Sequence, residues 1–310
     1  MKELKYPIAH DKQGYIIKAA DAVKGNDYTC IYCHQQMILR KSEKQLVRTH
    51  FAHKALSPNC TPESALHLAF KTLLFEKIKA CIDNKQPLPF RWQCSFCLDE
   101  HEGNLLKKIT RAEIEYNAGE CIPDIALFGD KGLFAAIEVV VSHAPDEQAL
   151  RFYDENSIII IEFHLKDEND LDMLREDVLN PAKVSICLND KCAKCSNHLS
   201  KMYLNVIQGK CWECLAPIKV ALFTGNDDCF IAGPEKFTLD EWNIAKSQDV
   251  TLAFQQDKTI NKQYLSNVCP ECKWVITQYF LAAEYLPRAL KGEFNRKKIA
   301  CGYFCHHCGL

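Results

Sequence analysis

The feature that most constrains this chain is the spacing of its cysteines. Eighteen cysteines occur in 310 residues. At this density chance would give about one pair with two residues between, yet the sequence has six. A Cys-x-x-Cys turn places two thiolates where both can reach one tetrahedral zinc ion, whereas a redox protein needs only one such pair. We therefore expect structural zinc at these pairs: Cys30/Cys33, Cys94/Cys97, Cys192/Cys195, Cys211/Cys214, Cys269/Cys272 and Cys305/Cys308.

Length, charge and hydropathy narrow the class of protein. The length suggests about two domains, or three if some are small. A formal net charge of −2 argues against a strongly basic nucleic-acid coat, although a local basic groove is still allowed. No apolar run reaches the ~18 residues that span a bilayer, and residues 1–7 lack the apolar core of a signal peptide. We expect a cytoplasmic protein without a membrane partner, in which disulfides are disfavoured.

Residues 1–60 read as a small zinc module with a short strand at 15–17. It offers five candidate ligands for a site that needs four. Cys30, Cys33 and His53 come first, and Cys60 is preferred to His50 for the fourth place. A packing or surface role for His50 is the alternative.

A helix is predicted from Thr61 to about residue 84. Thr61 can cap it, and Pro62 suits the first helical position, where its missing N–H costs nothing. Glu63, His67 and Lys71 recur every four residues and share one face. That face is either a solvated row of ion pairs or the polar edge of an active site.

Residues 104–165 resemble a compact α/β unit with near-continuous apolar strands, which suit a sheet covered on both faces. A three-residue loop over residues 130–132 would pair Gly129 with Leu133 and set Asp124 opposite Glu138 on one face. Two carboxylates so close favour a divalent cation such as Mg²⁺. Alternatively, one carboxylate lies at a solvated strand end, or a different loop length sends the two to opposite faces. Strands are predicted at 109–116, 122–128, 133–141 and 157–163, and a helix at 144–154.

After Pro181 the sequence is rich in cysteine again, which predicts zinc ribbons with short strands rather than a large core. One site should use Cys211, Cys214, Cys269 and Cys272. For the other pairs, Cys94/Cys97 would join Cys192/Cys195, or Cys192/Cys195 would join Cys305/Cys308. At least three structural zinc ions are expected.

Four segments in the first half of the chain resemble the competence-protein CoiA-like family. The Cys94-x-x-Cys97 knuckle resembles one branch of that family, and the C-terminal knuckles resemble a zinc ribbon often appended to such nucleases. The four segments are Tyr28-Thr29-Cys30-Ile31-Tyr32-Cys33, His50-Phe51-Ala52-His53, Glu63-Ser64-x-x-His67-x-x-x-Lys71, and Pro123-Asp124 followed by Ile137-Glu138-Val139-Val140-Val141-Ser142-His143.

The resemblance implies an α+β fold: a restriction-endonuclease-like core at 61–185, with zinc modules at 1–60 and 186–310. It implies that Asp124 and Glu138 hold catalytic Mg²⁺ or Mn²⁺, with Glu63 as an accessory acid. The position two after Glu138 usually carries a lysine or another polar residue that orients the attacking water, but here it is Val140. We favour Lys71 for that role, and Gln148 and His143 are the alternatives.

Three functions compete. The first is a metal-dependent endo- or exodeoxyribonuclease of DNA uptake, processing or defence, whose zinc modules position the DNA. The second is a nuclease-like zinc protein that has lost catalysis and binds nucleic acid or a partner protein. The third is a zinc-stapled scaffold. Basic clusters that could contact phosphates occur at residues 40–41, 107–108 and 296–298.

Overall fold

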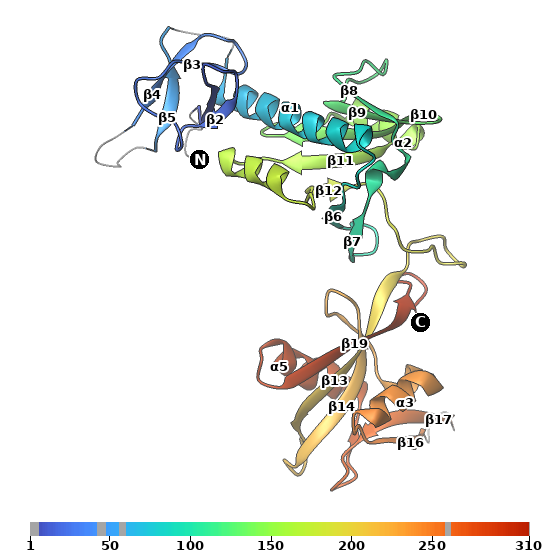
Figure 1. Cartoon of the computed structure of the whole chain (residues 1–310). Helices are drawn as coiled ribbons and strands as arrows, with labels where there is room; N and C mark the ends of the chain where they lie inside the picture. Colours follow the sequence, from blue (N-terminus) through green and yellow to red (C-terminus); the bar gives the residue numbers. More distant parts are fainter. Residues whose placement is uncertain (1–5, 42–47, 56–59, 258–261, 310) are drawn as a thin grey trace. The chain divides into compact units, whose positions relative to one another are not determined.

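The computed structural model describes residues 6–41, 48–55, 60–257 and 262–309. The fold is a mixed α+β arrangement of several sheets and few helices, which confirms the coarse class (Figure 1). The chain divides into two compact units, the first formed by residues 1–95 and 100–186 and the second by 96–99 and 187–310. The boundary expected after residue 60 falls inside the first unit, and each unit is described by itself below.

The first unit begins with a small five-stranded sheet in the order β2-β1-β3-β4-β5. Its core contains Tyr28, Met37 and Phe51 together with the thiols of Cys30 and Cys60, so the predicted zinc ligands are part of the packing. The strands are β1 (Ile8–His10), β2 (Ile16–Lys18), β3 (Tyr28–Thr29), β4 (Gln36–Arg40) and β5 (His50–His53).

Helix α1 (Pro62–Asp83) begins and ends as predicted. The Thr61 hydroxyl accepts a hydrogen bond from the Ser64 amide at 3.1 Å, and Pro62 occupies the first turn. The backbone of Asn84 closes the C-terminus. Thr61, the cap of helix α1, directly follows Cys60. The predicted zinc ligand Cys60 and the helix are therefore joined without a linker.

The central sheet of the first unit has the order β12-β11-β10-β9-β8, in which only β10 and β11 run parallel. Helix α1 packs on one face through Phe70 against Phe163. Helix α2 (Glu147–Glu155) packs on the other through Tyr153 with Ala136 and Ile160. Helices on both faces explain the near-continuous apolar strands. The strands are β8 (Arg111–Ile114), β9 (Ile125–Gly129), β10 (Gly132–Val140), β11 (Ile159–His164) and β12 (Lys183–Val184).

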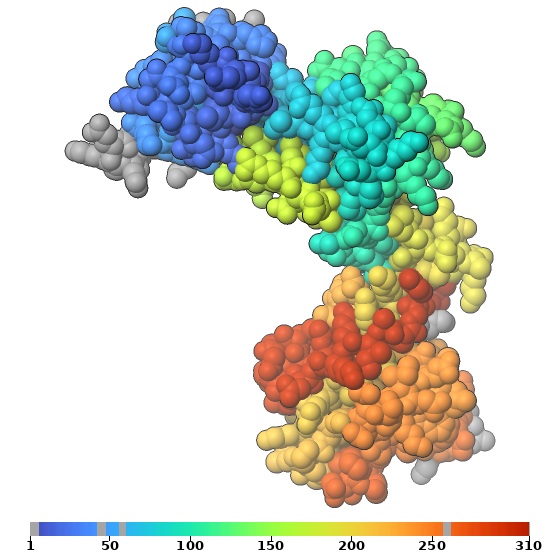
Figure 2. All heavy atoms as spheres, viewed as in Figure 1, coloured from blue at the N-terminus to red at the C-terminus, as the bar shows by residue number. Residues whose placement is uncertain are grey.

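Ion pairs fasten the small sheet to the η2 helix (Glu168–Arg175) of the same unit. Lys18 Nζ lies 2.6 Å from Asp172 Oδ1, and Arg48 pairs with Glu168. In Figure 2 the blue atoms of the N-terminal segment lie beside the cyan atoms of the same unit. The unit also holds a two-stranded sheet of β6 (Phe90–Gln93) and β7 (Glu100–Gly103), and the short η1 helix (Leu105–Lys108).

The second unit has a larger core than the sequence suggested. Strands predicted to be short are long, namely β13 (Ser200–Lys210) and β14 (Pro217–Thr224). Two buried clusters flank them, one around Leu222 and Leu281 and one around Leu204 and Phe223. The expectation of ribbons without a large core was wrong. Successive residues of a strand point to opposite faces, and here the residues on both faces are apolar, so both faces of the hairpin are buried. The other elements are β15 (Phe230–Ala232), η3 (Pro234–Lys236), α3 (Leu239–Ser247), β16 (Leu252–Asp257), β17 (Lys262–Val268), β18 (Val275–Ile276), α4 (Gln278–Phe280), η4 (Leu281–Tyr285), α5 (Leu286–Leu290) and β19 (Asn295–Phe304).

Candidate functional site

Four groups of cysteine and histidine ligand atoms could each hold a zinc ion. Within each group the ligand atoms lie within 4.8 Å of one another. All 18 cysteines are unbridged, and every cysteine of the six pairs belongs to one of the groups. The groups are Cys30/Cys33/His53/Cys60, Cys94/Cys97/His101/Cys187, Cys192/Cys195/Cys305/Cys308 and Cys211/Cys214/Cys269/Cys272.

The grouping corrects one prediction and selects among alternatives. Cys94/Cys97 does not join Cys192/Cys195, because His101 and Cys187 complete its set. The alternative that joined Cys192/Cys195 with Cys305/Cys308 agrees with the structure. His101 and Cys187 were missed, since neither belongs to a Cys-x-x-Cys pair. The position of His101, four residues after Cys97, could have marked it as a third ligand of that knuckle.

The N-terminal group uses Cys60 rather than His50, as preferred from the sequence. Cys33 Sγ lies 3.1 Å from His53 Nε2, and Cys30 Sγ lies 3.4 Å from Cys60 Sγ. The His50 ring instead bonds the carbonyl of Arg48. Burial raises the pKa of Cys60 to about 12, so its thiolate needs a nearby cation such as zinc. Three thiols and an imidazole are a donor set that suits zinc.

All six Cys-x-x-Cys turns share one backbone conformation. The residue directly after the second cysteine has a positive φ in every case, and in the Cys30, Cys211 and Cys269 turns its amide bonds the first cysteine's carbonyl at 3.0 Å. Five of the six are not glycine, which costs of order 1 kcal/mol or more each. A strained turn that recurs six times supports one shared cause, a metal held by both thiolates. The residues are His34, Leu98, Ser196, Leu215, Lys273 and Gly309.

The carboxylate pair depends on the β9–β10 hairpin, and the predicted route to its register was wrong. Gly129 pairs with Gly132, not with Leu133. A register shift between Leu133 and Ala135 then restores the predicted alignment, since Ala136 pairs with Ala126 and Ile137 with Ile125. Gly132 has φ +113°, a left-handed value that glycine adopts without strain. The pairing ends there, and Asp124 and Glu138 are the next residues on the two strands, with side chains that contact helix α1 and helix α2, respectively.

Charged residues lie next to one another on successive strands of the central sheet, and we call them a row. The amide of Glu115 donates to the carbonyl of Asp124 at 3.2 Å. On the other side, Glu138 pairs with Glu162, and Glu162 pairs with Lys183. Glu162 is buried and was missed from the sequence, although an acid inside the apolar run of residues 158–163 is a usable signal. One row thus carries four acids and one lysine.

Asp124 is bound by the polar face of helix α1. Its Oδ2 lies 3.0 Å from His67 Nε2 and accepts the Val139 amide at 2.9 Å, and its Oδ1 lies 3.3 Å from Lys71 Nζ. Burial raises the pKa of Asp124, but the bond and charge of His67, with Val139 and Lys71, outweigh it and hold that pKa below its usual value. Asp124 is therefore ionised at neutral pH.

Lys71 is almost fully buried, with 4% of its side chain exposed, and it also pairs with Glu115 at 2.6 Å. Glu115, directly after β8, thus faces helix α1, whereas Glu113 of β8 pairs with Arg111. The face shared by His67 and Lys71 is not a solvated row, because both side chains contact buried Asp124.

Glu138 has a different environment. The Tyr153 hydroxyl of helix α2 donates to its Oε1 at 2.6 Å. Burial, together with the negative charges of Asp124 and Glu162, raises the pKa of Glu138 to about 7, although the Tyr153 bond opposes the rise. At neutral pH this carboxyl is divided between its two protonation states, and a divalent cation would favour the ionised one.

The remaining predicted site residues lie around the end of β10. Glu63 accepts the Ser142 hydroxyl at 2.8 Å, and the same hydroxyl lies 2.7 Å from His143 Nδ1. Gln148 is exposed on helix α2. Among the described residues, the groups of three or more close metal ligands are the four cysteine groups, and the sheet carboxylates form none.

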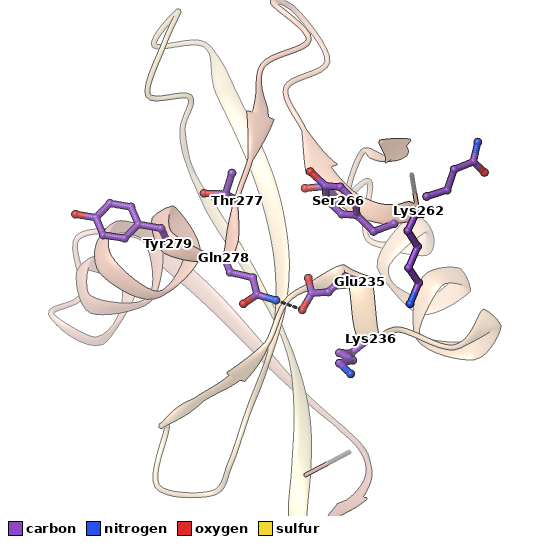
Figure 3. Close-up of a pocket in the computed structure, with 9 residues that line it drawn as sticks. Glu235, Lys236, Lys262, Ser266, Thr277, Gln278 and Tyr279 are labelled. Carbon is purple, nitrogen blue, oxygen red and sulfur yellow. Dashed lines mark hydrogen bonds between the residues drawn. The ribbon is translucent and has the colours of Figure 1, made fainter. Parts of the chain in front are cut away.

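Two further surfaces add little to the site. The basic cluster at residues 296–298 is neutralised in part, because Arg296 and Lys298 both pair with Asp228. An open hollow of about 490 Å³ in the second unit is lined by Lys236, Lys262 and Tyr279, among others. In Figure 3 Glu235 and Gln278 meet across it through a hydrogen bond. Among the described residues that line it, Glu235 is the one acid, and none is a cysteine or a histidine.

Comparison of the chain with protein-family models, curated proteins and solved structures found no match. Among the residues that the structure describes, no helix is long and apolar enough to cross a membrane.

Proposed function

We propose that this protein is a metal-dependent nuclease acting on DNA, with a restriction-endonuclease-like core in the first unit. The observation that carries the proposal is the convergence on Asp124. Helix α1 supplies His67 and Lys71 to it, and burial together with its negative charge raises the pKa of Glu138 on the adjacent strand. A zinc-stapled scaffold has no use for a buried, ionised carboxylate beside a second one that titrates near neutrality.

Asp124 and Glu138 would hold Mg²⁺ or Mn²⁺, since such ions take one or two protein carboxylates and keep sites for water and phosphate oxygens. The ion would lower the pKa of a bound water and stabilise charge on the phosphoryl group. Asp124 is kept ionised by His67 and Lys71 before any ion arrives. Glu63 fixes Ser142 and the chain beyond β10, which supports its predicted accessory role.

The four zinc groups would give DNA a rigid surface. Lys107 and Lys108, exposed near the central sheet, can contact phosphates, as can exposed Arg40 and Lys41 of the N-terminal module. The alternative is a nuclease-like protein without catalysis, which binds nucleic acid or a partner protein. Val140 favours that alternative because valine can neither orient water nor contact phosphate.

The deciding experiment compares wild type with Asp124→Ala and Glu138→Ala on single- and double-stranded DNA with Mg²⁺ or Mn²⁺. We expect cleavage by wild type and none by either variant, with zinc content close to wild type and both variants folded at the assay temperature. Glu113→Ala is the matched control, because Glu113 is an acid of the same sheet that pairs outward with Arg111. Binding of DNA by wild type without cleavage under any metal would favour the non-catalytic alternative.

A further inference from the structure

The position two after Glu138 lacks a polar side chain, but its neighbour on the next strand does not. Val140 pairs with His164 in the parallel ladder of β10 and β11, and the amide of Leu165 donates to the Val140 carbonyl at 2.8 Å. Directly paired residues of adjacent strands project on the same face, about 5 Å apart. His164 therefore stands beside Val140 on the face that carries Glu138.

The imidazole of His164 is held in one orientation. Its Nε2 lies 3.1 Å from Oε2 of Glu162, the buried acid that pairs with Glu138 across the ladder. Burial raises the pKa of Glu162, but Lys183 and His164 outweigh it and keep that pKa below its usual value, so the acid is ionised. An ionised acceptor at Nε2 favours the tautomer with the proton there, which leaves a lone pair on Nδ1.

The other end of the ring is available. Half of the His164 side chain is exposed, and Nδ1 has no hydrogen-bond partner in the described part of the chain. Lys71, the residue favoured from the sequence, is instead 4% exposed and bound to Asp124 and Glu115. A base must meet an incoming water molecule, which suits the exposed ring of His164. Lys71 is instead placed as the counter-ion of Asp124.

We propose that His164, positioned by Glu162, is the general base that replaces the polar residue missing at Val140. The inference rests on the proposed nuclease function. Water attacks phosphorus as its proton passes to Nδ1 of His164. The bond between phosphorus and the leaving oxygen breaks, and that oxygen takes a proton from solvent. The imidazolium then returns its proton to solvent.

The test begins with His164→Ala, for which we expect a 10²- to 10⁴-fold loss of cleavage rate. DNA binding, followed with Ca²⁺ in place of Mg²⁺, should change less than about threefold, since a general base acts in the chemical step. The decisive variant is Val140→Lys/His164→Ala, which restores a polar group at the adjacent place. It should recover at least tenfold of the lost rate, which a merely structural role of His164 would not allow.

Arg151→Met is the matched control, because Arg151 is an exposed cation of helix α2, which covers the same face of the sheet, and its ion-pair partner is Glu147 rather than a residue of the proposed site. It should keep cleavage within about threefold of wild type. If Val140→Lys fails to fold, added imidazole should restore part of the activity of His164→Ala instead. Wild-type cleavage that depends on Asp124 but survives His164→Ala would overturn this inference and leave the nuclease proposal standing. Absence of wild-type cleavage would overturn both.

Discussion

The four cysteine groups and the row of carboxylates both gather acidic side chains, but the protein stabilises them differently. Each cysteine group brings four ligand atoms within 4.8 Å of one another, without a lysine or arginine among them. In the sheet, His67 and Lys71 neutralise Asp124, Lys183 neutralises Glu162, and Glu138 binds Tyr153. The thiolates depend on an ion, whereas the carboxylates are already compensated by protein groups.

This difference teaches which groups need an ion in order to fold and which do not. A group that cannot ionise without its cation binds that cation as part of folding. A site whose charges are already compensated can fold empty, bind an ion weakly and release it during turnover. The predictions below test this division, in order of decreasing effect.

Removal of zinc should have the largest effect. We expect close to four zinc ions per chain by metal analysis, and unfolding of both units after prolonged chelation, because apparent binding energies for structural zinc are about 10 kcal/mol or more. Removal of Mg²⁺ alone should shift the melting temperature by less than about 2 °C. Fewer than two zinc ions per chain would contradict the scheme.

Cys269→Ser should remove one of these ions and melt the second unit. Cys269 is fully buried beside Cys211 in the core cluster around Leu222 and Leu281. A fall of at least about 10 °C in the melting temperature corresponds to a few kcal/mol at this size. Cys229→Ser is the matched control, since Cys229 is an exposed cysteine outside the four groups. Unchanged zinc content in Cys269→Ser would show that Cys269 is not a ligand.

Lys71→Met should destabilise the first unit by about 3 kcal/mol, because it leaves Asp124 buried with less compensation. Addition of Asp124→Asn should recover most of that loss, since the uncompensated charge is then gone. Urea unfolding of both single variants and the double variant measures the coupling. If the losses in the free energy of unfolding simply add, Lys71 contributes by packing alone. The negative charge of Asp124 would then not be compensated by Lys71.

The raised pKa of Glu138 predicts a smaller, pH-dependent effect. Between its ordinary value and about 7, the folded chain keeps a proton that the unfolded chain has released. Stability from this group therefore falls as the pH rises through that window and is constant above it. Relative to wild type, Glu138→Gln should gain up to about 2 kcal/mol between pH 5 and pH 8 without added Mg²⁺. A difference that is flat with pH would refute the shift.

The smallest effect concerns the strained turns. Leu215 has φ +61° and is mostly exposed, so Leu215→Gly should stabilise the second unit by about 1 kcal/mol. Leu239→Gly, at an exposed leucine that begins helix α3, should destabilise it by a similar amount. Thermal melts of both variants test the point. A loss in Leu215→Gly would mean that its side chain, not the metal, holds the turn.

The sequence alone determined the features that depend on neighbours along the chain. Six knuckles followed from residue spacing, and the bounds of helix α1 followed from Thr61 and Pro62, because a cap acts within one turn. Strands β8 to β11 and helix α2 were predicted within about three residues of their observed limits, whereas the two-residue strand β12 was missed. The shared face of Glu63, His67 and Lys71 followed from helical periodicity.

Only the tertiary structure decided which distant groups meet. Spacing could not show that Cys94/Cys97 takes His101 and Cys187, because any knuckle can share an ion with any other that the fold brings near. Nor could it show the register shift between Leu133 and Ala135, after which Ile137 pairs with Ile125. Glu162 and His164 lie beside Glu138 and Val140 through a parallel ladder between β10 and β11, and the pairing of such strands depends on the whole crossover between them.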